Sequence, residues 1–261
     1  MPVAHRPEGG RRVSIIGLDA GCREAKTPEN VVACNDILSP MCGRYTSTKP
    51  VEVYAELFKA NAGQLFVEPR YNIAPTYDVL ACRAMPAGRE LALLHWGLIP
   101  AWAEDKKIGY RTINARAETV AVKPSYRTAF RRRRCLIAAD GFYEWQPGKP
   151  KKQPYYICLK EGRPFAFAGL WEHWEPEGME PVESCTIIVT TANGLINQIH
   201  DRMPVILSPR DYDLWLDPEV QEPEKVTPLL KPYPESEMEM WPVGLGVNSP
   251  KHDGQELTNR L

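Results

Sequence analysis

Cys42 follows Met41 directly, in the stretch MCGRY that covers residues 41–45. A chain that began at Cys42 would carry a free α-amine and a thiol on the same residue. Their ordinary pKa values are about 8 and about 8.5, so both are partly available as nucleophiles near neutral pH. An aldehyde would condense with the amine to an imine, and the thiol would then close a five-membered thiazolidine ring. An internal cysteine cannot react in this way, because its nitrogen belongs to an amide. By itself, Cys42 fits a buried core thiol better.

The stretch TINARAET places polar residues at alternating positions: Asn114, Arg116 and Glu118. In a strand these side chains would share one face, which does not suit an apolar core. The ordinary interpretation is a polar surface strand. The alternative is a row of groups that faces a ligand.

Two further stretches carry groups that could move protons. In ADGFYEW, Glu144 would share a strand face with Phe142, and desolvation among aromatic rings raises the pKa of a carboxyl group toward the range useful for proton transfer. In QIHDRMPVIL, His200 precedes Arg202 by two residues. A salt-bridged glutamate and a hydrogen-bonded structural histidine are the ordinary interpretations of the two.

Charge is distributed unevenly along the chain. The formal net charge is −1, which does not indicate a nucleic-acid-binding protein. Residues 101–134, however, hold ten cationic and three acidic side chains, a local charge of +7, and they end in the run Arg131 to Arg134. This run fits a solvated face as well as a DNA-binding surface. Residues 217–240 hold seven acids and two bases, and their proline content predicts a mobile acidic surface loop.

The cysteines indicate neither a disulfide scaffold nor a zinc ribbon, because their number is odd and none are spaced as Cys-x-x-Cys. We expect mostly buried thiols in a reducing cytosol, and no metal or other cofactor. The seven are Cys22, Cys34, Cys42, Cys82, Cys135, Cys158 and Cys185. No apolar run is long enough to span a membrane.

Short apolar runs separated by turn residues predict many strands and few helices. We expect an α+β fold with a mainly antiparallel, barrel-like sheet core and short flanking helices. Helices are predicted within 46–63, 124–130 and 208–216, with a side-chain cap from Ser47 or Thr48 on the first and a capping box from Ser208 and Asp211 on the last. Strands are predicted within 79–84, 91–98, 135–145, 154–160, 164–172, 185–192 and 204–208.

Residues 1–40 lack the pattern of the rest of the chain. They sustain no helical or strand period, and their short apolar stretch is interrupted by Asp19, which does not fit a signal peptide. We expect a disordered leader, a propeptide or a mis-assigned start, and favour the last because the segment ends at a methionine directly before Cys42. Residues 41–261 are predicted to form a single domain.

Taken together, the motifs resemble one family. In order along the chain they are MCGRY, RYNIAPT, HWGLIPAW, INARAET, CLIAADGFYEW and IHDRMPVILSP. The same order is seen in the SRAP family, the SOS-response-associated peptidases or abasic-site processing proteins. The likeness runs from Cys42 to about Val247.

The resemblance implies a genome-maintenance protein that crosslinks covalently to abasic sites in single-stranded DNA. The aldehyde of the ring-opened sugar would be captured as a thiazolidine by an N-terminal Cys42. Asn114 would orient the reacting carbon, Glu144 would be the general acid and base, and His200 would assist proton transfer. Some members have been proposed to remove their own N-terminal extension with the same cysteine, glutamate and histidine.

The resemblance also implies a DNA-facing groove. Arg44, Arg116 and Arg202 would hold phosphates, and bases would stack in a groove formed by Asn72, Pro75, Trp96 and Trp102. A monomer in the cytoplasm, associated with the nucleoid when DNA is damaged, and with no membrane partner, is expected.

Two alternatives stay open. In a cysteine peptidase, Cys42 would be the nucleophile with His200 and Glu144 as base and orienting group. In a non-covalent single-strand-binding module, Cys42 would be dispensable.

Overall fold

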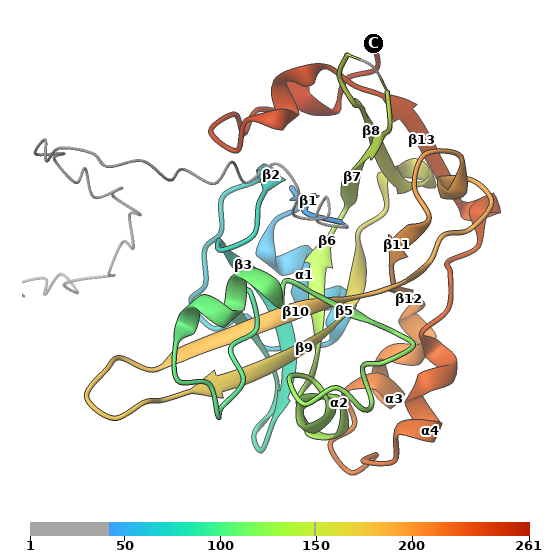
Figure 1. Ribbon diagram of the computed structural model, residues 1–261. Coiled ribbons are helices and arrows are strands. Elements are labelled where there is room, and N and C mark those ends of the chain that lie inside the picture. The colour runs from blue at the N-terminus through green and yellow to red at the C-terminus, as the bar shows by residue number, and fades with distance from the viewer. Residues whose placement is uncertain (1–41, 149) are drawn as a thin grey trace, which may run out of the picture. The chain divides into compact units, whose positions relative to one another are not determined.

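Two β-sheets form the part of the chain that the computed structural model describes, residues 42–148 and 150–261 (Figure 1). The expectation for residues 1–40 lies outside these residues. The strands are β1 Arg44–Ser47, β2 Arg70–Ile73, β3 Asp78–Met85, β4 Gly88–Trp96, β5 Asn114–Arg116, β6 Arg134–Ala139, β7 Gly141–Gln146, β8 Gln153–Leu159, β9 Phe165–Trp174, β10 Val182–Thr191, β11 Arg202–Pro204, β12 Ile206–Leu207 and β13 Met238–Pro242.

The described helices are short. The α-helices are α1 Val51–Phe58, α2 Arg127–Arg132, α3 Tyr212–Leu216 and α4 Pro223–Val226. Single 3₁₀ turns are η1 Lys106–Arg111, η2 Lys160–Gly162, η3 Ile196–Gln198, η4 Pro209–Asp211, η5 Thr227–Leu229, η6 Glu235–Glu237, η7 Leu245–Asn248 and η8 Gln255–Thr258. None of the helices among these residues has the length and apolar character needed to cross a bilayer. The predicted α+β class with short helices is confirmed.

The larger sheet closes on itself. Its strand order is β11-β10-β4-β3-β6-β9-β12, and β9 also pairs with β10, so β10, β4, β3, β6 and β9 form a ring. Pairing is antiparallel except where β10 meets β4 and β5. The smaller sheet has the order β13-β8-β7-β1-β2. The predicted mainly antiparallel, barrel-like core is therefore confirmed.

The two sheets share an aromatic core. Tyr45 of β1 lies 5.3 Å from the Trp96 ring and 5.5 Å from the Phe167 ring, centroid to centroid, both edge-on. Phe142 of β7 contacts the same Phe167 ring at 6.0 Å. All four side chains are at most 1% exposed. This packing fixes β1 and β7 against the ring of strands.

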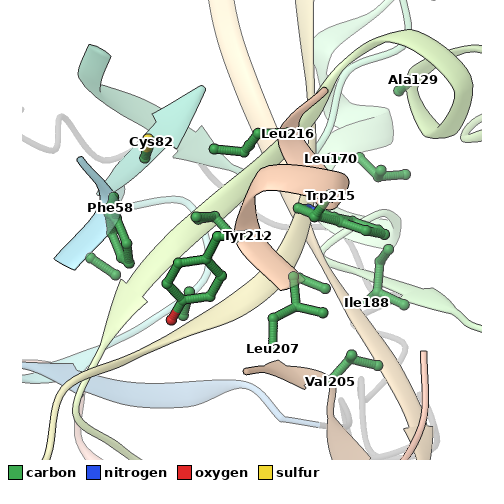
Figure 2. Close-up of a cluster of buried hydrophobic side chains, with 14 of the residues drawn as sticks. Phe58, Cys82, Ala129, Leu170, Ile188, Val205, Leu207, Tyr212, Trp215 and Leu216 are labelled. Atoms are coloured by element: carbon green, nitrogen blue, oxygen red, sulfur yellow. The ribbon is translucent and has the colours of Figure 1, made fainter. Parts of the chain in front are cut away.

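A second core lies under the helices (Figure 2). Tyr212, Trp215 and Leu216 of α3 pack against apolar side chains of the barrel, and Phe58 of α1 meets Tyr212 with ring centroids 5.6 Å apart. The indole Nε1 of Trp215 donates to the carbonyl of Cys135 at 2.9 Å, which ties α3 to β6. Helices this short owe their stability to such packing rather than to their own hydrogen bonds.

Several local predictions are wrong. The run 135–145 is two strands in different sheets, β6 and β7, divided at Asp140. Residues 217–240, predicted as a surface loop, contain α4, η5, η6 and the start of β13. The N-cap of α1 is Pro50, which has no side-chain group that could cap the helix. No side chain caps η4 or α3 either. The predicted capping hydrogen bonds therefore do not form at these helices.

Candidate active site

Cys42 lies two residues before β1 and is 4% exposed. Its backbone N–H donates to Oε1 of Glu144 at 2.9 Å. Its φ of +47° lies in the left-handed region, which costs a residue other than glycine about 1–3 kcal/mol. The backbone nitrogen of Cys42, the atom that would be an amine at a chain start, therefore faces a carboxylate in a strained conformation.

Strand pairing explains why these two residues meet. β1 pairs antiparallel with β7, with Arg44 opposite Tyr143 and Tyr45 opposite Phe142. The residues just before β1 therefore reach the level of Glu144. Phe142 and Glu144 point to the same face of β7, as the alternation in ADGFYEW predicted. Glu144 is 2% exposed.

The environment changes the proton affinity of both groups. Burial raises the pKa of Glu144, although His200 and the hydrogen bonds from Cys42 act in the opposite direction. Burial, reinforced by the Glu144 carboxylate, raises the pKa of the Cys42 thiol well above its ordinary value. The site therefore holds a protonated thiol beside a carboxylate with increased affinity for a proton.

His200 follows η3 and is fixed by the backbone. Its Nδ1 lies 3.0 Å from the backbone nitrogen of Arg202 and 3.2 Å from the carbonyl oxygen of the same residue, and the tautomer of the ring decides which of the two it bonds. Nδ1 also lies 3.4 Å from Oδ1 of Asp201. The influence of His200 on the Glu144 pKa places it within electrostatic reach of that carboxylate. Cys42, Glu144 and His200 are thus brought to one site.

A cationic edge is built around the end of β10. On one side β5 pairs with it in parallel, with Asn114 opposite Ile187, and on the other β11 pairs with it antiparallel, with Arg202 opposite Thr191. Arg116 at the end of β5 is exposed. Tyr126 donates its hydroxyl to the carbonyl of Asn114 at 3.0 Å. Asn114, Arg116 and Arg202 therefore lie around one strand end.

Glu118 departs from the predicted pattern. β5 ends at Arg116, so Glu118 stands in the following turn and does not extend a shared strand face. It nevertheless forms an ion pair with Nη1 of Arg202, whose side chain is 19% exposed. Arg202, one of the cations predicted to bind phosphate, is therefore already paired with the carboxylate of Glu118.

Comparisons with known proteins match the part of the chain that holds these site residues. The model of the SOS response associated peptidase (SRAP) family matches residues 41–250. The abasic site processing protein YoqW of Bacillus subtilis is 46% identical over 223 residues, which span 83% of this chain and 98% of its own. The abasic site processing protein YedK of Escherichia coli is 30% identical over 223 residues, spanning 83% and 98% respectively.

A solved structure agrees with the sequence comparison. A protein from Bacteroides thetaiotaomicron matches with a TM-score of 0.77 at 26% identity, over 84% of this chain and 100% of its own. The chain belongs to the SRAP family. The resemblance of the motifs is therefore confirmed.

One residue predicted to face DNA is instead in the SRAP core. Trp96 is fully buried between the sheets, and its indole Nε1 donates to the carbonyl of Ile113 at 2.9 Å. Its ring meets Tyr45 edge-on and offers no face to a base. The reason is that Trp96 ends β4 inside the closed ring, where its large apolar surface is better removed from water.

Asn72 is also buried and is not a DNA-facing residue. Its amide donates to the carbonyls of Val247, Ser249 and His252 at 3.2, 3.0 and 2.8 Å, and its Oδ1 accepts Nη1 of Arg44 at 2.9 Å. Asn72 therefore holds the C-terminal segment 247–252 against β2.

Arg44 takes part in the same tether. Its Nη1 donates to the carbonyl of Val247 at 2.7 Å, and burial lowers the pKa of its guanidinium. A role for Arg44 toward phosphate stays a prediction, and it would have to be combined with this structural contact.

The other predicted stacking residues remain accessible. Trp102 is 60% exposed, in the segment between β4 and η1. Pro75 is half-buried, next to the exposed Thr76 with its φ of +74°. Both can present an apolar surface to a base.

Two residues that hold the site in place, Asp140 and Trp145, were not predicted from the sequence. Asp140 accepts the Thr46 and Thr48 hydroxyls and the Thr48 N–H, the last at 2.8 Å, so it anchors the end of β1. Trp145 donates its indole N–H to Oδ1 of Asn248 at 2.7 Å. Asp140 could have been noticed as an acid inside the apolar run 135–145, whereas nothing near Asn248 in the sequence indicates its partner.

Proposed function

We propose that this protein processes abasic sites in single-stranded DNA by forming a covalent thiazolidine with Cys42. The observation that carries the proposal is the 2.9 Å hydrogen bond between the Cys42 nitrogen and the buried carboxylate of Glu144. Membership of the SRAP family, and relatives named abasic site processing proteins, support the choice of an abasic sugar as the aldehyde.

The chemistry requires that the active chain begin at Cys42. Translation from Met41 followed by removal of the methionine would produce this end, and so would cleavage of the peptide bond before Cys42. We favour the start at Met41. The strained φ of Cys42 and the adjacent Glu144 also suit a self-cleavage, should the longer chain be made.

Bond formation then proceeds in two steps. The neutral amine adds to the aldehyde carbon, and Glu144 carries a first proton from nitrogen to oxygen, which gives the carbinolamine. Glu144 then carries the second amine proton to the hydroxyl, which leaves as water and gives the imine. The thiol of Cys42 adds to the imine carbon, its proton goes to nitrogen, and the five-membered ring closes. The raised pKa of Glu144 suits this exchange in both directions, which also allows reversal.

The neighbouring residues receive matching roles. His200, held through Nδ1 by the backbone of Arg202, assists proton transfer at the sugar oxygen. Asn114 orients the reacting carbon. Arg116 and Arg202 bind flanking phosphates, and Trp102 with Pro75 supplies stacking surface, where one base is worth about 1–3 kcal/mol.

The raised thiol pKa favours this proposal over a general cysteine peptidase. Such peptidases rely on a thiolate at rest, usually stabilised by a cation. Here the Cys42 thiol is buried and faces a carboxylate, and both influences oppose ionisation. Addition to an imine needs no resting thiolate, because the electrophile is already activated.

The test uses protein that begins at Cys42 and a single strand with one abasic site. We expect an adduct that survives denaturing electrophoresis. Cys42→Ser should bind reversibly and give an adduct only when borohydride reduces the imine, because the amine remains and the thiol is lost. The matched control is Cys82→Ser, a buried thiol on β3. A denaturation-resistant adduct with Cys42→Ser, without borohydride, would overturn the thiazolidine. So would equal crosslinking by protein that retains residues before Cys42.

A further inference from the structure

The α2 helix presents an exposed cationic face that the proposed chemistry does not use. Its Ala129 and Phe130 are buried, whereas Arg127, Arg131 and Arg132 are exposed. Together with Thr128, the three arginines line a surface hollow of about 310 Å³. The lining contains no apolar residue, so the hollow suits an anion better than an apolar ligand.

The run of four arginines at 131–134 has two separate roles. Arg133 forms an ion pair with the buried Glu172, and Arg134 is 4% exposed. Arg134 donates to carbonyls at the end of α2, in α3 and in the segment after α3, among them those of Trp215 and Asp217 at 2.6 Å each. Arg133 and Arg134 therefore hold the structure together, and only Arg131 and Arg132 extend the exposed face.

No described residue balances the charge of the three exposed arginines by an ion pair. Within the described residues, none of Arg127, Arg131 and Arg132 forms an ion pair. Two acids of the segment that Arg134 contacts have other partners. Asp217 accepts the N–H of Glu219 at 2.9 Å, and Glu222 pairs with Lys225 at 3.2 Å.

Their spacing keeps these charges close together. Residues i and i+4 of a helix are neighbours, so Arg127 and Arg131 repel each other by about 0.2–0.5 kcal/mol when no anion lies between them. An anion bound in the hollow would remove this repulsion.

We propose that the exposed face of α2 is a second DNA-binding surface, which contacts phosphates of the strand away from the lesion. α2 precedes the first residue of β6, whereas β7 with Glu144 continues from the other end of β6 (Figure 1). Six residues of strand span about 20 Å. The surface therefore reaches DNA beyond the nucleotides at Cys42. The choice of DNA as the polyanion rests on the proposed function.

The composition of the surface favours phosphate over an acidic peptide. Guanidinium groups match phosphate oxygens in a two-pronged geometry, and Thr128 adds a hydroxyl donor. A peptide partner would be expected to insert an apolar anchor, and no apolar residue is among those that line the hollow. A run of phosphates along one strand can engage all three arginines at once.

The test measures reversible binding of undamaged single strands by fluorescence anisotropy across a range of salt concentrations. The variant is Arg127→Gln/Arg131→Gln/Arg132→Gln. Its matched control, Lys160→Gln/Arg210→Gln/Lys231→Gln, removes three exposed cations elsewhere and changes the net charge equally. On a strand of about 30 nucleotides we expect the α2 variant to bind roughly ten-fold or more weakly at low salt, and its salt slope to fall by about 2. On a strand of about 3 nucleotides it should match the parent protein, because so short a ligand cannot reach both sites.

Three results would overturn the proposal. The first is that the α2 variant and the parent bind the long strand equally well. The second is that the control variant loses as much affinity for the long strand as the α2 variant does. The third is that the α2 variant loses affinity for polyglutamate but keeps its affinity for DNA. Crosslinking to a short abasic strand, measured separately, tests the proposed function. A protein that fails to crosslink yet shows the α2-dependent salt slope would refute the thiazolidine alone.

Discussion

Two buried glutamates on strands of different sheets differ in how their charge is balanced. Glu172 on β9 is 4% exposed, and its carboxylate forms an ion pair with Arg133 at 2.6 Å, with a second contact at 2.9 Å. Glu144 on β7 is 2% exposed, and in the described part of the chain it has no ion pair with a lysine or arginine. Its Oε1 accepts the N–H of Cys42.

The difference separates a structural carboxylate from one suited to chemistry. A guanidinium holds a carboxylate in a fixed charge state and a fixed place. Without one, burial leaves the carboxylate with a raised proton affinity, so that it can both accept and return a proton. Keeping an unbalanced buried charge is unfavourable for stability. Its retention at Glu144 is what a function would require.

The largest effect is expected from Glu144→Gln. The amide keeps the size of the side chain and accepts the Cys42 N–H, but it cannot exchange a proton. Crosslinking to an abasic strand should slow by about 10²–10⁴-fold, the usual contribution of a general acid and base. The measurement is the rate of adduct formation on denaturing gels, together with the rate of its reversal after transfer to a competing abasic strand.

Glu172→Gln is the matched control for that experiment, because it makes the same change in another buried strand position. It should crosslink at close to the parent rate. If Glu144→Gln crosslinks as fast as Glu172→Gln, Glu144 is not the general acid and base, and its role is structural like that of Glu172.

The same control variant should instead lose stability. Glu172→Gln leaves Arg133 without its counter-charge in a site where the arginine side chain is 27% exposed. Loss of a buried pair costs 3–5 kcal/mol, and partial exposure should reduce this to about 2 kcal/mol. Urea unfolding measures it, and Arg133→Met combined with Glu172→Gln should recover part of the loss. An unchanged unfolding midpoint would show that this pair contributes nothing.

The site was more predictable from the sequence than its supports. Cys42, Glu144 and His200 stand in motifs whose order indicated the family, and the structure brings them to one site. Trp96 shows the limit of this approach, because a motif names a residue without saying which way its side chain points. Whether an aromatic ring stacks on a base or fills a core depends on sheet closure, which is a property of the whole fold.

Long-range pairing explains the other failures. Asp140 divides an apolar run into strands of two sheets, and its partners Thr46 and Thr48 lie more than ninety positions earlier. The tether of Asn72 to residues 247–252 spans most of the chain. Local propensity predicted the class and most strands, but contacts at such separations are decided by packing, which no local pattern records.

The raised pKa of Glu144 predicts a specific dependence of stability on pH. Between the ordinary pKa of the unfolded chain and the raised pKa of the folded one, the native state binds more protons. Stability contributed by Glu144 should therefore fall as pH rises through that window and be recovered as pH is lowered. The check is the free energy of unfolding in urea at several pH values for the parent and Glu144→Gln. The difference between the two should narrow toward acid pH. A difference that widens toward acid pH would mean that the folded protein lowers this pKa.

The smallest effect is expected from a change at Glu118, the carboxylate that pairs with Arg202. Glu118→Gln removes the partly exposed counter-charge of Arg202, leaving that guanidinium available for phosphate. Exposed pairs are worth about 0.2–1 kcal/mol, so affinity for an undamaged single strand should rise by about 1.4- to five-fold. Glu222→Gln breaks the Lys225 pair in α4 and is the control. Anisotropy at low salt is the measurement. If affinity falls instead, Glu118 holds Arg202 in its binding position, and the paired state is then the one that meets the DNA.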